Sequence, residues 1–253
     1  MATFTSHSAV DLQALPSIWT RCSLSLNTAS LNIVKMPLQL RPAVPEDIPE
    51  MCQVYYSAFG DTYIGSRVFT SDIDASNRFF QKAFMDDIAD PLCELLVVTH
   101  KSSPGSKDEK VVSLAKWALP GASIQDPPPA EAWPANGDLA VEFFGAMTRG
   151  HRKLIGDRPH YYLELICTHE TWQGKGAGTL LLRWGIERAD TDALPCFLEA
   201  TPKGKLVYEK LGFRIKAEEE FKWSFGTFVE TYMERDAKIE KRTMTRPKSK
   251  EFA

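Results

Sequence analysis

The chain of 253 residues is long enough for one large domain with extensions, and its 33 acidic side chains slightly outnumber the 30 basic ones, for a formal net charge of −3. This balance gives no basic footprint for nucleic acid, and no apolar run approaches membrane-spanning length. The five cysteines are odd in number and lack paired spacing, which predicts reduced intracellular thiols rather than disulfides or a zinc site.

Both ends of the chain differ in composition from its middle. Residues 1–35 are rich in Ser and Thr, and their basic side chains, Arg21 and Lys35, are too few to favour an organellar transit peptide. We expect a disordered extension there, a domain over residues 36–234, and a solvated basic tail over residues 235–253. A nuclear-targeting or acidic-partner tail is the alternative for residues 235–253. Because the signals for an organelle or the nucleus are weak, we favour a cytoplasmic location over a nuclear or mitochondrial one.

The first part of the domain is predicted to hold a strand, two helices and a strand pair. Residues 37–41 read as a short strand, and Pro45 with the acids after it begins a helix. A second helix is expected over residues 71–87, and strands over 93–99 and 111–119 with a polar loop between them. The apolar face of the first helix is formed by Ile48, Met51, Cys52, Tyr55 and Phe59.

An insertion follows at about residues 120–155. A proline run at 126–129 predicts an extended loop, and residues 139–152 predict a helix. The insertion is either a surface excursion or a lid over the substrate cleft. The apolar residues available for a lid are Trp117, Phe143, Phe144 and Met147, although helical spacing places some of them in the core.

The second part reads as strand, glycine turn, helix, strand, helix and strand. The first strand covers residues 160–168, and simple alternation predicts Tyr162, Glu164, Ile166 and Thr168 on one face and Leu163, Leu165 and Cys167 on the other. A short strand at 195–200, the segment 205–213 and a last strand at 223–232 complete the domain.

The glycine turn between the 160–168 strand and the following helix is predicted to bind an anion. Gly174, Gly176 and Gly178 allow backbone angles at which successive N–H groups point at one anion, and the helix adds its positive N-terminal end. The P-loop spacing is absent, and Thr179 stands where the dinucleotide fingerprint needs its third glycine. A glycine-rich turn without a ligand is the alternative.

Two motifs identify the kind of anion. Gln173, Gly176 and Gly178 form a Gln-x-x-Gly-x-Gly pattern that resembles the pyrophosphate loop of the GNAT superfamily of acyl-CoA N-acyltransferases, and Tyr208 before Gly212-Phe213 resembles its second signature. The resemblance spans residues 38–233. It implies an α/β (α+β) fold with a mixed sheet of about six or seven strands, flanked by helices and splayed at its centre, and acetyl-CoA as acyl donor without a metal.

The resemblance also implies which residues bind the coenzyme. The turn and first helical residues would hold the diphosphate, and the backbone of the preceding strand would pair with the pantetheine arm. Thr201 stands where many members have asparagine and would hydrogen-bond the same arm. The implied cofactor-binding residues are Ile166, Cys167, Thr168, Gln173, Gly174, Lys175, Gly176, Ala177, Gly178, Thr179 and Thr201.

Acyl transfer to an amine also needs a base and an acid. A carboxylate within a central apolar strand is costly unless it is paired or functional, so Glu164 is the candidate base; an ordinary ion pair at a strand edge is the alternative, and His160 and His169 are rival bases. Tyr208, matched to the motif, is the candidate general acid, with a core tyrosine as the alternative. A covalent route through Cys167 is disfavoured, because buried cysteine is common in strands.

Residues 195–201 and 113–117 resemble the puromycin N-acetyltransferase type, which implies a small-molecule amine as acceptor. A protein lysine or N-terminal acetyltransferase, and a non-catalytic acyl-CoA-binding module, are the alternatives. We expect a monomer or homodimer with neither nucleic acid nor membrane as partner.

Overall fold

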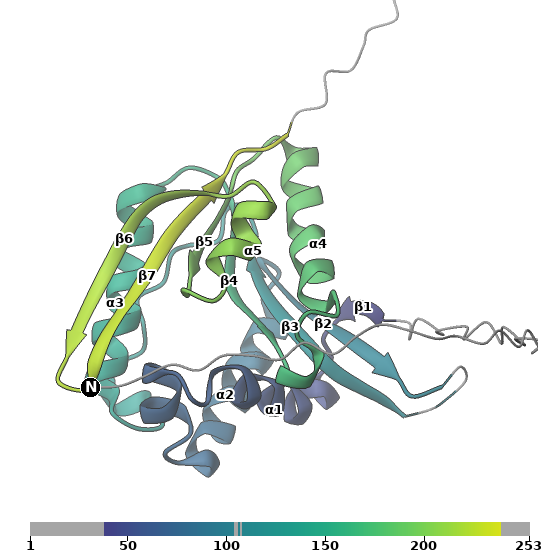
Figure 1. Ribbon diagram of the computed structural model, residues 1–253, viewed down its shortest axis with the longest axis horizontal. Coiled ribbons are helices and arrows are strands. Elements are labelled where there is room, and N and C mark those ends of the chain that lie inside the picture. The colour runs from purple at the N-terminus through teal and green to yellow at the C-terminus, as the bar shows by residue number, and fades with distance from the viewer. Residues whose placement is uncertain (1–37, 104–105, 107, 239–253) are drawn as a thin grey trace, which may run out of the picture. The chain divides into compact units, whose positions relative to one another are not determined.

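A computed structural model describes residues 38–103, 106 and 108–238, so the predictions for residues 1–35 and 239–253 lie outside the described residues. Seven strands of the described part form one mixed sheet in the order β1-β2-β3-β4-β5-β7-β6 (Figure 1). Neighbouring strands are antiparallel except β4 and β5, which are parallel. The strands are β1 (Leu38–Pro42), β2 (Cys93–Lys101), β3 (Glu109–Ala118), β4 (Tyr161–Thr168), β5 (Cys196–Ala200), β6 (Arg214–Trp223) and β7 (Gly226–Arg235).

Helices cover both faces of the sheet. One buried cluster joins it to α1 (Ile48–Phe59), α2 (Ile73–Ala89) and α3 (Gly137–Leu154), and a second joins its other face to α4 (Ala177–Asp192) and α5 (Lys205–Lys210). We call these the α1 face and the α4 face. Short helical turns precede several of these elements: Pro45–Asp47, Gly65–Phe69, Ala130–Ala132 and Glu170–Trp172. No helix in the described ranges is both long and apolar enough to cross a membrane.

Close packing fixes α4 on the sheet. A Cβ atom at Gly185 would lie 2.4 Å from the Trp117 ring, and the Trp117 indole N–H donates a 3.2 Å hydrogen bond to the Leu181 carbonyl. Trp117 is 0% exposed. Its assignment to a lid is therefore wrong, because it points to the α4 face and the insertion packs on the α1 face.

The strand β6 was not predicted, and the last strand runs over 226–235 rather than 223–232. β6 pairs only with β7 and lies at the sheet edge, where most of its side chains are exposed. An edge strand with both faces largely in water carries no apolar alternation, so the usual signal is missing.

A bulge in β4 overturns the predicted alternation. Lys116 pairs with Leu165 and Trp117 with Leu163, so Glu164 is an extra residue without a partner in β3. Tyr162 therefore shares the α1 face with Leu165 and Cys167, whereas Leu163 and Ile166 pack on the α4 face. One inserted residue reverses the facing of every later side chain.

The two parallel strands separate beyond this bulge. β4 pairs with β5 only through Tyr161, Tyr162 and Leu163, which face Cys196, Phe197 and Leu198. Residues 164–168 pair with β3 alone, so their backbone edge towards β5 stays open. This is the splay that the resemblance implied, and we call its starting point, at Leu163 and Leu198, the apex.

Candidate active site

The glycine turn has the geometry that an anion cradle needs. Gly174 has φ +74° and Gly176 has φ +92°, and a Cβ atom at either would meet nothing within 4 Å. Glycine is required at these positions for its conformation and not for lack of space. Residues 173–176 are exposed, and α4 begins directly after them at Ala177. The N–H groups of its first turn, which have no acceptor within the helix, therefore follow the loop at once.

This loop is attached to the end of β4. The Gln173 side-chain amide donates a 3.1 Å hydrogen bond to the Thr168 carbonyl, and a Cβ atom at Gly178 would lie 3.3 Å from Thr168 Oγ1. Thr168 is itself held by Ser113, with 2.7 Å between the two hydroxyl oxygens. The structure thus brings the predicted turn residues and the open edge of β4 together, with the Lys175 ammonium 4.8 Å from the Trp172 ring centre.

The predicted cysteine and threonine positions differ in what their side chains do. Cys167 is buried on the α1 face, where burial raises the pKa of its thiol, so it stays protonated and unreactive. Thr201 lies in the turn before α5, and its hydroxyl accepts a 3.3 Å hydrogen bond from the Gly204 N–H.

Within the described part of the chain, no three His, Cys, Asp or Glu side chains gather in a way that could ligate a metal.

Tyr208 lies on α5 at the α4 face. Its side chain is 7% exposed, and its ring lies so close to Gly204 that a Cβ atom there would be 2.9 Å from Cε2. Burial, and then the charge of Glu230, raise the pKa of Tyr208. The phenol is therefore neutral at physiological pH, which is the protonation state that a proton donor requires.

Glu164 is held in an ion pair. Its Oε1 accepts a 2.8 Å hydrogen bond from Lys116 Nζ, which also lies 2.9 Å from Asp87 Oδ1. The Glu164 side chain is 43% exposed. Burial opposes the charge on Lys116, but Glu164 and Asp87 together raise the pKa of this ammonium. Glu164 thus makes an ion pair, and it makes it directly beside the apex.

The structure reveals two carboxyl groups that the sequence analysis missed. Glu199 on β5 accepts a 2.8 Å hydrogen bond from the Tyr162 hydroxyl at the apex, and Glu230 lies on β7, the next strand. Burial raises the pKa of both carboxyl groups to about 8. The signal that pointed to Glu164, an acid within an apolar strand, is equally present at Glu199 in the run Cys196-Phe-Leu-Glu-Ala200.

Both rival histidines have structural partners. His160 lies before the splay, and its Nε2 is 2.7 Å from His151 Nε2 while its Nδ1 is 2.7 Å from the Arg158 carbonyl. Since a carbonyl only accepts, His160 carries its proton on Nδ1 and accepts from His151. His169 caps the turn Glu170–Trp172 by accepting a hydrogen bond from the Thr171 N–H.

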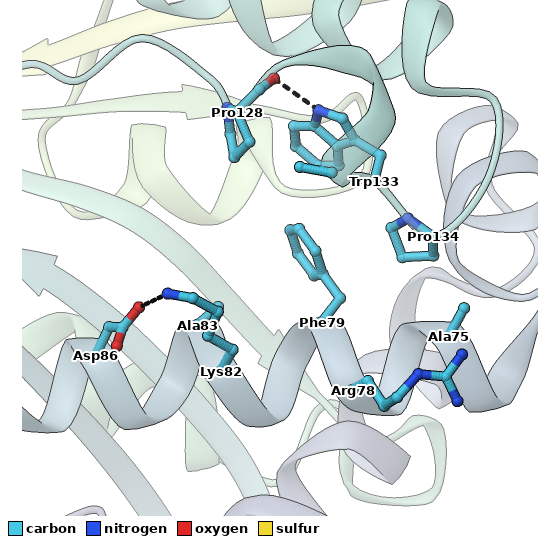
Figure 2. A pocket seen from close by; sticks show the side chains of 10 residues that line it. Ala75, Arg78, Phe79, Lys82, Ala83, Asp86, Pro128, Trp133 and Pro134 are labelled. Atoms are coloured by element: carbon cyan, nitrogen blue, oxygen red, sulfur yellow. Dashed lines mark hydrogen bonds and ion pairs between the residues drawn. The ribbon is translucent and has the colours of Figure 1, made fainter.

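The insertion builds part of the α1 face. The α3 helix crosses β7, where the Tyr232 hydroxyl donates a 3.0 Å hydrogen bond to the Ala146 carbonyl and Phe143 lies 5.9 Å from Phe228. The proline loop of the insertion and α2 border an open groove of about 520 Å³. Phe79 of α2 points towards Trp133 in this groove (Figure 2). None of the residues lining this groove is a predicted site residue.

Comparison with known proteins agrees with this geometry. Residues 141–233, from α3 through most of β7, match the family model of the acetyltransferase (GNAT) domain. The chain has the GNAT fold. An acetyltransferase of Stachybotrys chartarum is 26% identical over 198 residues, which are 71% of this chain and 81% of the relative.

Solved structures of acetyltransferases are also similar to this chain. A structure from Corynebacterium glutamicum, described as histone acetyltransferase HPA2 and related acetyltransferase, matches with a TM-score of 0.51 and 19% identity over 81% of this chain and 99% of that one. The PaiA N-acetyltransferase of Thermoplasma acidophilum, solved with coenzyme A, has a TM-score of 0.49 at 13% identity, over 79% and 99% of the two chains. At 19% identity, the likeness to the Corynebacterium structure shows the fold alone.

Proposed function

We propose that the chain is an acetyl-CoA-dependent N-acetyltransferase whose acceptor is the primary amine of a small molecule. The observation that carries the proposal is the position of the glycine turn at the mouth of the β4–β5 splay. The turn offers N–H groups at the start of α4, and the open edge of residues 164–168 leads from it to the apex. Acetyl-CoA fits these two features: its diphosphate would bind the N–H groups of the turn, and its extended, amide-bearing pantetheine arm would pair with the open edge of β4.

The chemistry assigned to this site uses side chains on both faces of the sheet. The amine attacks the thioester carbonyl carbon, the C–S bond breaks, and Tyr208, a neutral phenol, donates a proton to the leaving thiolate. An alkylamine is mostly protonated at neutral pH and must lose a proton before it attacks. Glu164 is our proposed acceptor of that proton, with Lys116 holding its carboxylate in place.

The packing of the insertion favours a small acceptor over a protein segment. The α3 helix lies directly across β7 on the α1 face, with Phe143 and Ala146 in contact with residues of that strand. Of the acidic side chains near the apex, Glu199 and Glu230 are withdrawn from the surface, and the partly exposed Glu164 is paired with Lys116. A groove for a basic protein segment would instead present unpaired acids to solvent.

Two measurements test the proposal. Isothermal titration of the full chain with acetyl-CoA measures cosubstrate binding, and free-thiol release with a panel of aliphatic, aromatic and peptide amines measures transfer. We expect saturable acetyl-CoA binding and thiol release with at least one small amine. No uptake of acetyl-CoA or of longer acyl-CoAs by the folded chain would end the proposal.

A further inference from the structure

We infer that Glu199 and Glu230 form a binding site for the ammonium group of the acceptor, so that this site takes alkylamines that are cationic at neutral pH and carry an apolar body. The inference rests on the proposed acetyl transfer, because it specifies the acceptor class. It concerns residues outside the glycine-turn motif and the Tyr208 motif.

The two carboxyl groups lie beside the reacting position. Glu199 is the first residue of β5 beyond the segment paired with β4, so it stands where the splay begins. It lies opposite Tyr232 on β7, and Glu230 is two residues away from Tyr232 on the same face. Such diagonal neighbours have Cβ atoms about 7–8 Å apart, a span that one ammonium group with its hydrogen-bond donors can bridge.

Both carboxyl groups lack the donors that buried acids need. Glu199 Oε2 receives the Tyr162 hydroxyl, but Glu199 Oε1 and Glu230 Oε2 are buried and have no hydrogen-bond partner among the described residues. The Glu230 residue is only 5% exposed. A buried acceptor without a donor is costly. These two oxygen atoms are therefore ones that a ligand with N–H donors would satisfy.

Other acids of the domain show the contrast. Glu164 is paired with Lys116, and Glu234 is paired with Arg158 and Lys216. No ion pair to Glu199 or Glu230 occurs in the residues that the structure describes. Among the buried acids of the described residues, Asp47 and Glu234 each have a basic partner, whereas Glu230 has none, and its neighbour Glu199 at the apex has none either.

The side chains packed next to this site are aromatic: Phe228 is half-buried, and Phe143 and Phe221 belong to the core behind it. Phe228 lies two residues from Glu230 on the same face of β7, and Phe143 lies 5.9 Å from Phe228 and 5.0 Å from Phe221 between ring centres. A ligand whose ammonium contacts Glu230 would thus place the atoms beyond it against aromatic rings. This order favours an apolar body over a second charged group.

The titration of the pair gives the inference a second readout. Burial raises the pKa of both carboxyl groups to about 8. At Glu199 the Tyr162 hydroxyl lowers the pKa in part, and the charges of Glu230 and Glu164 raise it further. The phenols of Tyr162, Tyr208 and Tyr232 beside them have raised pKa values and stay neutral at pH 7. From α3, the neutral His151 ring lies against Tyr162, and the charges of Glu219 on β6 and Arg149 on α3 act on Tyr232. The free pair is therefore largely protonated at pH 7, and binding of an ammonium ion must release a proton to the buffer.

The experiment uses the full chain saturated with coenzyme A, which occupies the donor site without allowing transfer. Calorimetric titration with 2-phenylethylamine and with the neutral 2-phenylethanol compares a cation with a close neutral analogue, in two buffers of different ionisation enthalpy. We expect the amine to bind at least about tenfold more tightly than the alcohol and to release a proton. Glu199→Gln and Glu230→Gln should each weaken the amine about 10- to 100-fold and reduce proton release.

The control is Glu187→Gln, which removes the same charge from an exposed position on α4 and should change neither quantity. Unchanged coenzyme A affinity shows that a variant is folded. Equal affinity for amine and alcohol, no amine binding, or unchanged amine affinity in both site variants overturns the inference while leaving the acetyltransferase proposal intact. A chain that does not bind coenzyme A fails at the earlier step, and the two failures are thus distinct.

Discussion

The Tyr162 hydroxyl donates a 2.8 Å hydrogen bond to Glu199 Oε2, and so links β4 to β5 at the last point before the strands separate. The same bond also affects the protonation of Glu199: burial raises the pKa of this carboxyl group, and the Tyr162 hydroxyl opposes part of that rise. Tyr162 is thus a positioning residue for the carboxyl group that we assign to ammonium binding.

Replacing Tyr162 should therefore change how the enzyme responds to pH. In Tyr162→Phe the pKa of Glu199 rises, so a larger fraction of the pair is protonated at pH 7. We expect kcat/KM for 2-phenylethylamine to fall about tenfold at pH 7, and the acidic limb of its pH profile to move to higher pH. The control is Tyr161→Phe, which removes the neighbouring hydroxyl that binds Asp192 at 2.6 Å. If the pH profile of kcat/KM in Tyr162→Phe is the same as that of the unaltered chain, Tyr162 does not influence the titration of Glu199.

The role of Tyr208 predicts a loss of rate without a loss of binding. In Tyr208→Phe the buried ring remains in contact with Gly204 and Phe213, but no proton donor faces the leaving thiolate. We expect kcat to fall about 10²- to 10⁴-fold, with the acetyl-CoA dissociation constant nearly unchanged. Rapid thiol-release assays and calorimetry measure the two quantities. An unaffected rate would remove Tyr208 from the mechanism.

The glycine turn permits a matched pair of substitutions. Gly176 has φ +92° and Gly121 has φ +96°, and a Cβ atom at either meets nothing within 4 Å. Alanine at either site should cost a similar amount of stability, about 1–2 kcal/mol, because the left-handed backbone disfavours any side chain. Only Gly176→Ala should weaken acetyl-CoA binding, by about tenfold or more, because only that residue shapes the cradle. Equal affinities of the two variants in calorimetry would contradict the assignment of the loop.

What could be predicted from the sequence was local. The Gln173 to Gly178 turn depends on residues within one short segment, and so does the buried stripe of α1. The structure places both as expected. The splay could be implied only by resemblance, because it depends on where pairing between β4 and β5 ends.

The predictions for side chains failed where the position or pairing of a residue depends on a contact with a residue far away in the sequence. The bulge at Glu164 depends on how β4 pairs with β3, which the sequence of β4 alone does not show. Simple alternation placed Cys167 on the face opposite Tyr162, and the bulge places both on the same face. Glu164 and Glu199 look alike as acids in apolar strands. The difference between them is Lys116, which lies 48 residues before Glu164 in the chain and pairs with only one of the two.

The buried histidine pair predicts how stability depends on pH. His151 is 1% exposed, and burial, with the neighbouring His160, lowers its pKa to about 3. In the unfolded chain the same imidazole has a pKa of about 6.5. Below that pH the unfolded state therefore binds a proton at His151 that the folded state does not bind. The contribution of His151 to stability is therefore complete above pH 6.5 and declines by about 1.4 kcal/mol per pH unit as the pH falls below it.

Glutamine at position 151 isolates this contribution, because its amide can still donate to His160 Nε2 but does not titrate in this range. We expect the unfolding free energy of His151→Gln, measured by denaturant titration, to fall less steeply than that of the unaltered chain between pH 6.5 and pH 5. Over that interval the difference between the two chains should shrink by about 2 kcal/mol. The control His169→Gln makes the same change at a half-buried loop position and should retain the original slope. Parallel pH profiles for the unaltered chain and His151→Gln would show that the imidazole is protonated inside the fold, and the neutral hydrogen-bonded pair between α3 and the start of β4 would then be wrong.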